Sequence, residues 1–511
     1  MNPFERLHPA LQHHIVNSLG WPRLRPLQEA SIDPILDGEH AILLAPTAGG
    51  KTEAACFPVF SRMLSENWAA SSVLYLCPIK ALLNNLLPRL EAYTALLGRR
   101  VELWHGDIGV AAKTRILSDP PDILLTTPES LEGMLVSPRV DHRIFFANIR
   151  CVIIDEVHAF AGDDRGWHLL ALIERIQRLA GQELQRLGLS ATVGNPELLA
   201  DWLAGSCSQA RRVLHPPAAP SQTSDVQLDW VGSLENAALV ISRLHRGEKR
   251  LVFVDSRSRV ERLAVELRAR GVDTYVSHSS LSLEARRSAE NAFAEGQNCV
   301  IVATSTLELG IDVGDLDRVI QVDAPFAVAS FLQRIGRTGR RNGSSRNCLF
   351  LATTPAAFLR TLGLLRLWRS GYVEPIEPPA MPTHIYAQQA MALALQERGI
   401  VAGDVDAWLA GMPGFASIGT EMRQQALDHM LATGILHSDN GLMGIGLAGE
   451  EAFGRRHFLE LLSVFTSPPM VAVYHGRELL GDVHQLTFAL DQKGPTLLTL
   501  GGRSWVTNHV D

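Results

Sequence analysis

Residues 45–52, APTAGGKT, have the side-chain types of a loop that holds phosphate groups. Such a loop is written G-x-x-x-x-G-K-[ST], because glycines let backbone N–H groups close around phosphate oxygens. Lys51 would reach the β- and γ-phosphates of a nucleoside triphosphate, and Thr52 would coordinate magnesium. Ala48, Gly49 and Gly50 would form the cradle. The opening residue is alanine, so a glycine-rich turn that caps a helix is an alternative interpretation.

Two acidic residues follow an apolar run about a hundred residues later, in CVIIDEVHAF at 151–160. Asp155 and Glu156 should therefore lie at the carboxyl end of a buried strand, where open α/β sheets expose their ligand sites. Packing gives no reason for two adjacent carboxylates at this point. Phosphoryl chemistry does, since Asp155 would hold magnesium through water and Glu156 would orient and deprotonate the attacking water.

The ordered set APTAGGKT, PESL, DEVH, SAT, ATSTLELGID and QRIGRTGR resembles the motif set of superfamily 2 helicases of the DExH type. The resemblance covers about residues 20 to 355. It implies two RecA-like domains, ATP-dependent helicase activity, and ATP and Mg²⁺ as cofactors. In this superfamily the phosphate loop commonly begins with alanine, so Ala45 fits, whereas Ala48 is a smaller departure from glycine.

The same resemblance assigns further residues to the nucleotide site. Gln28, in LRPLQEASI, matches the upstream glutamine that reads the adenine edge, and an exposed helix residue is the alternative. Gln333, Arg337 and Arg340 match the motif that faces the triphosphate. Their guanidinium groups would neutralise charge that builds up on the γ-phosphoryl group. Asp312, in LELGID, fits the same set, with a structural turn as the alternative.

Loops after other predicted strands, including CPIKALLNN at 77–85, carry hydroxyl groups, basic side chains and helix N-terminal amides. Such groups suit phosphate oxygens and carry no base preference. The best candidates for contacts to a nucleic-acid strand are Thr127, Ser256, Arg257 and Thr304. If each domain holds the sugar-phosphate backbone, alternate tightening of the two grips would move the protein along a single strand. Binding should then be independent of sequence and sensitive to salt.

Longer stretches resemble the large helicase-related (Lhr) group over nearly the whole chain. They are RGWHLLALIERI at 165–176, PAMPTHIYAQQAMAL at 379–393, GRRHFLELLSVFTSPP at 454–469 and LGGRSW at 500–505. Members of the group place a winged helix and a β-barrel after the motor domains, move 3′ to 5′ on single-stranded DNA, and unwind duplexes that include RNA:DNA hybrids. The resemblance implies single-stranded DNA and tailed duplexes as partners. The expected barrel is incomplete at residue 511, which leaves a place for a protein partner at the C-terminus.

Short apolar runs separated by helical patterns must position these residues. The runs lie at 40–45, 73–78, 122–127, 151–155 and 187–192 in a first block, and at 251–256, 273–278, 299–304, 318–323 and 347–353 in a second. Such alternation is typical of βαβ units around buried parallel sheets. The predicted fold class is α/β, with two tandem RecA-like parallel-sheet domains followed by a winged-helix domain and a partial β-barrel segment.

Two proline-rich joins set the predicted domain boundaries, HPPAAPSQTSD at 215–225 and VEPIEPPAMP at 373–382. The expected domains are a first RecA-like domain at 1–214, a linker at 215–225, a second RecA-like domain at 226–372, a winged helix at 373–450, and a helix with the start of a barrel at 451–511.

Composition narrows the function classes. The formal net charge of -7 disfavours coating of nucleic acid by bulk attraction, but not a grip inside a local groove. No apolar stretch reaches the roughly 18 residues that span a bilayer, and the start MNPFERLHPALQHH lacks the features of a signal peptide. We therefore expect no membrane and a cytoplasmic protein. The six cysteines stand singly, without zinc spacing, and are interpreted as reduced small hydrophobic residues.

Two other functions remain open from the sequence. One is an ATPase that moves along duplex DNA without separating it. The other is a nucleotide-gated subunit that recruits further proteins, for repair or for defence against foreign DNA. The sequence does not decide between DNA and RNA as the natural track.

Overall fold

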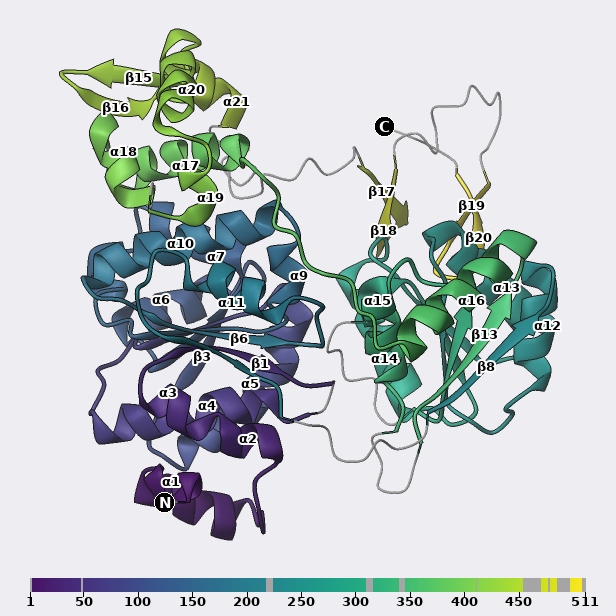
Figure 1. The fold of residues 1–511 in the computed structure, drawn as a ribbon. Coiled ribbons are helices and arrows are strands. Elements are labelled where there is room, and N and C mark those ends of the chain that lie inside the picture. The colour runs from purple at the N-terminus through teal and green to yellow at the C-terminus, as the bar shows by residue number, and fades with distance from the viewer. Residues whose placement is uncertain are drawn as a thin grey trace. The chain divides into compact units, whose positions relative to one another are not determined.

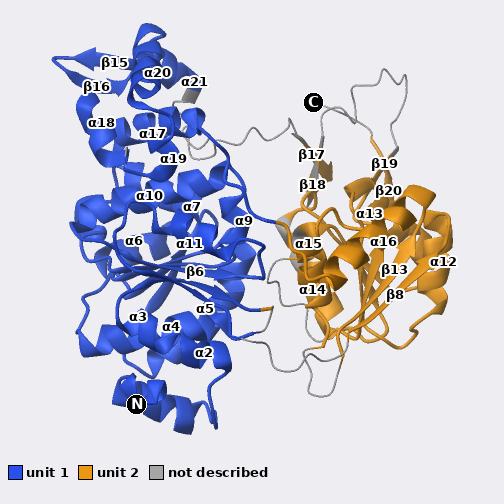
Figure 2. Cartoon of the chain, in the orientation of Figure 1, with its two compact units in different colours: residues 1–45, 49–217, 375–466 blue, residues 46–48, 218–374, 467–511 orange. Residues whose placement is uncertain are grey.

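The chain divides into two units in the computed structural model (Figure 2). Unit 1 contains residues 1–45, 49–217 and 375–466, and unit 2 contains residues 46–48, 218–374 and 467–511. The structure describes residues 2–46, 49–216, 224–308, 316–339, 345–409, 411–453, 470–476, 478–484 and 497–507. The chain thus enters each unit more than once.

Unit 1 is built on a parallel sheet of strand order β3-β4-β2-β5-β6-β1-β7. Its strands are β1 His40–Leu44, β2 Val73–Leu76, β3 Val101–Trp104, β4 Ile123–Thr126, β5 Cys151–Ile154, β6 Gln185–Ser190 and β7 Arg211–Leu214. The central strands are buried at every position, which explains their nearly continuous apolar sequence. Since the strands are parallel, the loops after β1, β2, β4, β5 and β6 all leave the sheet at one edge.

Helices cover both faces of this sheet (Figure 1). They are α1 Pro9–His13, α2 Pro26–Ala30, α3 Ile32–Leu36, α4 Lys51–Ser65, α5 Lys80–Ala95, α6 Val110–Ser118, α7 Pro128–Val136, α8 His142–Phe145, α9 His158–Ala161, α10 Asp164–Ala180 and α11 Pro196–Ala204. Local sequence sets several of their ends. Asp163 caps α10 through a hydrogen bond from the Arg165 N–H, and Gly181 ends it with a positive φ of 66°.

Unit 2 repeats the design with a parallel sheet of strand order β10-β11-β9-β12-β13-β8. The strands are β8 Asp225–Trp230, β9 Arg250–Phe253, β10 Thr274–Ser277, β11 Val300–Ala303, β12 Arg318–Val322 and β13 Asn347–Ala352. The helices are α12 Leu234–Arg243, α13 Arg257–Ala269, α14 Leu283–Glu295, α15 Val328–Ile335 and α16 Pro355–Arg369.

A small helical module follows in the chain and packs on α7 and α10 of unit 1 (Figure 1). Its elements are α17 Thr383–Gln396, β14 Ile400–Val401, α18 Ala402–Leu409, α19 Pro413–Ala416, α20 Thr420–Ala432, β15 Leu436–Asp439, β16 Leu442–Ile445 and α21 Leu447–Phe453. The strands form an antiparallel sheet in the order β14-β16-β15. The winged-helix prediction for this segment expected helices followed by a hairpin, and the module contains both.

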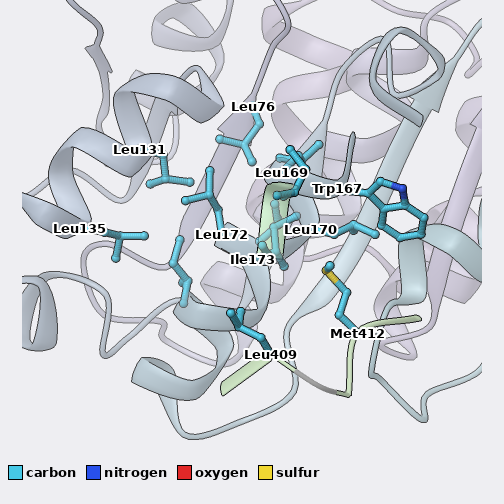
Figure 3. Close-up of a cluster of buried hydrophobic side chains, with 14 of the residues drawn as sticks. Leu76, Leu131, Leu135, Trp167, Leu169, Leu170, Leu172, Ile173, Leu409 and Met412 are labelled. Atoms are coloured by element: carbon cyan, nitrogen blue, oxygen red, sulfur yellow. The ribbon is translucent and has the colours of Figure 1, made fainter. Parts of the chain in front are cut away.

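The module shares one hydrophobic core with the first sheet (Figure 3). Leu409 and Met412 of the module are buried in the same cluster as Leu131 of α7 and Ile173 of α10. Trp167 of α10 also donates from Nε1 to the carbonyl oxygen of Pro379, at 2.7 Å. These contacts make the module part of unit 1.

The last described residues form hairpins within unit 2. Strands β17 Met470–His475 and β18 Glu478–His484 pair with each other, as do β19 Leu497–Leu500 and β20 Arg503–Val506. Leu498 and Leu500 enter the core of unit 2, and Glu261 of α13 accepts a hydrogen bond from the N–H of Gly501 at 2.6 Å. The described part of this segment therefore consists of small antiparallel sheets.

Comparison with the sequence predictions confirms the two tandem α/β sheets. Every predicted run between 40 and 353 overlaps an observed strand. The edge strands β3, β7 and β8 were not predicted, because their polar residues break the apolar runs. Strand β8 begins at Asp225, the last residue of the predicted linker.

Two expectations from composition can be compared with the structure. All six cysteines are buried and free of disulfides, which agrees with their interpretation as hydrophobic residues. Within the described ranges, no helix combines the length and the apolar character that crossing a membrane requires.

Candidate nucleotide and nucleic-acid sites

The phosphate-type loop connects β1 to α4 in unit 1. Lys51 begins α4, and its Nζ donates to the carbonyl oxygen of Ala45 at 2.8 Å, so the ammonium group folds back over the loop. Gly50 lies before the helix in the left-handed region, with φ 80°. A Cβ on Gly50 would lie 2.6 Å from Nε2 of Gln28, so both backbone and space require glycine here. The predicted contact residue Ala48 lies outside the described residues.

The N-terminal end of α4 is suited to bind an anion. The helix has 15 residues, and its first N–H groups have no partner within the helix. These N–H groups and the helix dipole together favour a phosphate at this end. Thr52 and Gly49 flank the same turn, so the loop has the strand-loop-helix context that the sequence motif requires.

Gln28 on α2 is buried beside this loop, with 3% of its surface exposed. Its Oε1 accepts from the N–H of Arg25 at 2.9 Å, and its Nε2 donates to the carbonyl oxygen of Gly50 at 3.4 Å. The alternative of an exposed helix residue is therefore wrong. A contact to adenine stays a prediction.

Asp155 follows β5 and is held on both carboxylate oxygens. Oδ2 accepts from the Tyr75 hydroxyl at 2.9 Å, and Oδ1 accepts from the Glu156 N–H at 2.9 Å. Burial raises the pKa of Asp155 to about 6, the charge of Glu156 adds to the rise, and the ammonium group of Lys51 opposes it. The charge of Lys51, at the phosphate loop, therefore acts on the Asp155 carboxylate.

Glu156 has a backbone φ of 49°, in the left-handed region that non-glycine residues rarely adopt. Such strain persists only where the surrounding structure imposes it, and it is concentrated at functional sites. The backbone bonds around it are consistent with this, because the N–H of Asp155 is held by Leu76 and that of Val157 by Leu189.

His158 connects this loop to the end of β6. Its Nδ1 lies 3.0 Å from Oγ of Ser190, and its Nε2 lies 3.5 Å from Oε2 of Glu156. Burial lowers the pKa of His158 to about 4, and the charge of Lys51 lowers it further, so the imidazole is neutral at physiological pH. Sequence reasoning gave His158 no role, although it stands in the DEVH motif. Ser190 begins the SAT motif, so the two motifs are in contact.

Two predicted strand-contact residues, Thr127 and Ser256, are helix caps. Thr127 accepts from the Ser130 N–H at 3.3 Å and caps α7, with 4% of its surface exposed. Ser256 accepts from the Arg259 N–H at 3.3 Å and caps α13. Their hydroxyls hold the first turns of these helices in place.

The other two predicted strand contacts follow β9 and β11 in unit 2. Arg257 is exposed at the start of α13, and its Nη1 donates to Oγ of Ser280 at 2.7 Å. Thr304 is half-buried, directly after β11. Ser256, Arg257 and Thr304 thus follow the carboxyl ends of neighbouring strands.

The QRIGRTGR motif lies on α15 and the turn after it. Gln333 is half-buried, and Arg337 is buried with 2% of its surface exposed, its Nη2 donating to the carbonyl oxygen of Glu308. Arg334, to which sequence reasoning gave no role, is buried over the ring of Phe253 and paired with Glu308. Burial raises the pKa of Glu308, and Arg334 opposes that rise. Asp312 and Arg340 lie outside the described residues.

Two family models match the chain, the DEAD/DEAH box helicase over residues 25–199 and the helicase conserved C-terminal domain over residues 234–342. The first contains the loop of Lys51 and the acids Asp155 and Glu156, and the second contains most of unit 2. The chain belongs to the superfamily 2 helicases. In this helicase the matched segments contain strands β1 to β6 of the first sheet and β9 to β12 of the second.

The helicase is similar to proteins of the Lhr group. It is 31% identical to the Lhr helicase/probable uracil glycosylase of Mycolicibacterium smegmatis, over 75% of this chain and 29% of that protein. It is 30% identical to the ATP-dependent helicase Lhr-Core of Methanothermobacter thermautotrophicus, over 72% of this chain and 46% of that protein. The chain spans less than half the length of these curated relatives.

A solved structure of the Mycobacterium smegmatis helicase Lhr, bound to single-stranded DNA and AMP-PNP, matches with a TM-score of 0.79 and 28% identity. The match covers 94% of this chain and 65% of that one. The helicase MrfA, bound to DNA and AMPPNP, matches with a TM-score of 0.78 at 19% identity, which shows a shared fold.

Within unit 1 of the helicase, the structure brings Lys51, Gly50 and Gln28 together at one loop, with Asp155 in the electrostatic field of Lys51. Sequence reasoning did not find Tyr75, which holds Asp155. A tyrosine in the otherwise aliphatic strand VLYL was the available signal.

Proposed function

We propose that this chain is an ATP-dependent motor that moves 3′ to 5′ along single-stranded DNA and unwinds DNA or RNA:DNA duplexes. The observation that carries the proposal is that Lys51 begins α4 in a strand-loop-helix turn and that its charge acts on Asp155, the neighbour of Glu156. The similar Lhr structure, which holds single-stranded DNA and AMP-PNP, supports both ligands.

Each residue of the nucleotide site has a proposed task. Lys51 and the N–H groups at the start of α4 bind the β- and γ-phosphates of ATP. Glu156 orients the attacking water and accepts its proton. Gln28, beside Gly50, contacts the adenine edge. His158 stays neutral and keeps Glu156 in place relative to Ser190.

The site fits a magnesium ion by its chemistry. The Thr52 hydroxyl and the Asp155 carboxylate are hard oxygen donors, the kind that Mg²⁺ prefers together with water and substrate phosphates. No cluster of three or more His, Cys, Asp or Glu residues that could hold a metal occurs among the described residues, and this mode of binding needs none. When bound, Mg²⁺ neutralises charge on the triphosphate.

Further residues are proposed to contact ATP. Gln333, Arg337, Arg340 and Asp312 are proposed to act on the triphosphate, as the motif match implies. Strand contacts are proposed at Thr127, Ser256, Arg257 and Thr304, where helix N-termini and an exposed guanidinium suit phosphate oxygens. The protein would then hold the sugar-phosphate backbone of the strand, so the motor would accept any base sequence. Cytoplasmic location and a protein partner at the C-terminus also remain predictions.

Unwinding of matched tailed duplexes tests the function. Purified chain with ATP and Mg²⁺ should displace a strand from a duplex with a 3′ single-stranded tail, and not from one with a 5′ tail or blunt ends. Lys51→Ala should abolish both hydrolysis and displacement. The same tails on DNA:DNA, RNA:DNA and RNA:RNA duplexes identify the track.

Three other outcomes would contradict the proposal. Displacement that ignores the tail would contradict the polarity. Hydrolysis stimulated by blunt duplex, without displacement, would indicate a duplex translocase. A chain that binds ATP but does not hydrolyse it when single-stranded DNA is added would indicate a nucleotide-gated subunit.

A further inference from the structure

Glu53, the residue after Thr52, is a buried carboxylate that the nucleotide site does not use. Its side chain is 6% exposed. Its Oε1 accepts from the Tyr93 hydroxyl at 3.0 Å and forms an ion pair with Nη2 of Arg89. Burial raises the pKa of Tyr93 to about 12, and the charge of Glu53 adds to the rise, so the phenol stays protonated and donates. Arg89 and Tyr93 both lie on α5.

A second contact continues this link between α4 and α5. Phe57, one turn after Glu53, meets the ring of Tyr93 edge-on with centroids 5.4 Å apart. Tyr93 is itself one turn after Arg89. Residues separated by four positions lie on one face of a helix, so one stripe of α4 faces one stripe of α5. The two helices are thus linked by charge and by an aromatic pair.

The first turns of α4 are also fixed from the other side. Pro58 has no N–H, so the carbonyl oxygen of Ala54 has no donor within the helix. Oγ of Ser31 donates to this oxygen instead, at 2.7 Å. The start of α4, which carries the phosphate loop, therefore has one support from α5 and another from Ser31.

The ion pair joins the buried Glu53 carboxylate to a guanidinium whose side chain is 44% exposed. A pair that reaches solvent contributes only about 0–1 kcal/mol to stability. Its contacts instead fix the position of α5 against α4. A leucine or methionine at residue 53 would satisfy packing alone. The pair is therefore better explained by the relative position of the two helices than by stability.

Helix α5 begins at Lys80, inside the loop CPIKALLNN that is a candidate for strand binding. Nζ of Lys80 pairs with Asp107 at 2.8 Å. From Lys80 to Arg89 the helix rises about 14 Å at 1.5 Å per residue. A strand bound at the start of α5 would act on Glu53 through this length of helix.

We propose that Glu53, Arg89 and Tyr93 are positioning residues that transmit strand binding at the start of α5 to the phosphate loop. The proposal rests on the proposed function of a strand-stimulated ATPase. A small shift of α5 moves the guanidinium and the phenol, and the Glu53 carboxylate follows them. Because Glu53 is adjacent to Thr52 and two residues from Lys51, the phosphate-binding turn changes with it.

The test compares ATPase rates with and without single-stranded DNA in Glu53→Gln, Arg89→Gln, the double variant and Tyr93→Phe. Changes along a coupling network typically alter coupling about 2- to 30-fold, so the stimulated rate should fall by that factor while the basal rate changes less. The double variant should lose no more than the worse single variant, since both break one link. Strand affinity without nucleotide, measured by fluorescence anisotropy, should stay near that of the unchanged chain.

Glu66→Gln is the matched control. Glu66 pairs with Arg62 at 2.8 Å at the far end of α4 and has no part in the link to α5. Full stimulation in folded Glu53→Gln and Tyr93→Phe would overturn the inference, and so would an equal loss of basal and stimulated rates. Tyr93→Phe removes a single hydroxyl, so it decides the matter if Glu53→Gln does not fold. Absence of stimulation in the unchanged chain would instead count against the proposed function.

Discussion

Arg175 of α10 and Glu132 of α7 form a fully buried ion pair, with Nη1 and Oε1 2.6 Å apart. Two glutamines of α17 complete it. Gln396 accepts from Nε of Arg175 at 2.9 Å, and Gln389 donates to Oε2 of Glu132 at 2.8 Å. His168 also contacts Oε2 of Glu132, at 3.0 Å. The small C-terminal module is therefore joined to the first sheet by buried charge as well as by apolar packing.

Replacement of Arg175 by methionine should strongly destabilise unit 1. Glu132 would keep a buried charge without its main partner, and breaking such a pair typically costs about 3–5 kcal/mol. Urea unfolding followed by tryptophan fluorescence measures the loss. Arg100→Met is the control, because Arg100 pairs with Asp119 in an exposed site, where about 0–1 kcal/mol is usual. Similar losses in both variants would show that burial does not matter here.

Acid should weaken unit 1 through Glu132. Burial alone would raise the pKa of this carboxyl, but Arg175 and the hydrogen bond with His168 lower it from 4.5 to about 2. A depressed pKa contributes stability that is complete above pH 4.5 and is lost as the pH falls from there through 2, by ~3 kcal/mol at most.

The pH dependence of Glu132→Gln tests this assignment. The difference in unfolding free energy between the variant and the unchanged chain should be constant above about pH 5 and shrink toward pH 2. A difference that stays constant down to pH 2 would contradict the role of Glu132.

Gly50→Ala should weaken nucleotide binding. Alanine in the left-handed region costs about 1–2 kcal/mol, and the new methyl group would lie 2.6 Å from Nε2 of Gln28. We expect about a tenfold loss or more in affinity for a fluorescent ATP analogue. Gly98→Ala is the control, since Gly98 has a φ of 65° but open space around it. A loss of affinity in Gly98→Ala as large as that in Gly50→Ala would contradict the specific role of Gly50.

Arg257→Ala should weaken single-stranded DNA equally for all sequences. Removing one phosphate contact should lower the slope of log affinity against log salt by about 0.7. DNA-binding titrations at salt concentrations between about 50 and 200 mM measure this slope. Arg262→Ala, which removes an exposed arginine of the same helix that pairs with Glu235, should leave the slope unchanged. The same slope in both variants would argue against Arg257 as a contact.

The buried strands and the phosphate loop could be predicted because their signals are local. A parallel strand buried on both faces needs a run of apolar residues, and the loop needs glycine at fixed positions. Edge strands such as β7, with the sequence RRVL, lack that run because one side faces solvent. Strand β7 is recognised as a strand only from its pairing with β1 in the structure.

The partners of the site residues could not be predicted, since they come from distant parts of the chain. Tyr75 reaches Asp155 across 80 residues, and Gln28 reaches Gly50 across 22. Glu53 gave a weak signal as a lone acid in the apolar run TEAACFPVF, but nothing in the sequence names Arg89 as its partner. Thr127 and Ser256 were predicted from hydroxyl chemistry, which a helix cap shares.

The order of segments along the chain has a consequence during synthesis. The face of α7 and α10 that receives Leu409 and Met412 is complete at Ala180, but α17 starts only at Thr383, after all of the second sheet has been made. At roughly 5–20 residues per second, the ribosome needs about 10–40 s for the residues in between. During this time the apolar face of α7 and α10, together with Arg175, stays exposed on the nascent polypeptide. It is a natural place for a chaperone to bind.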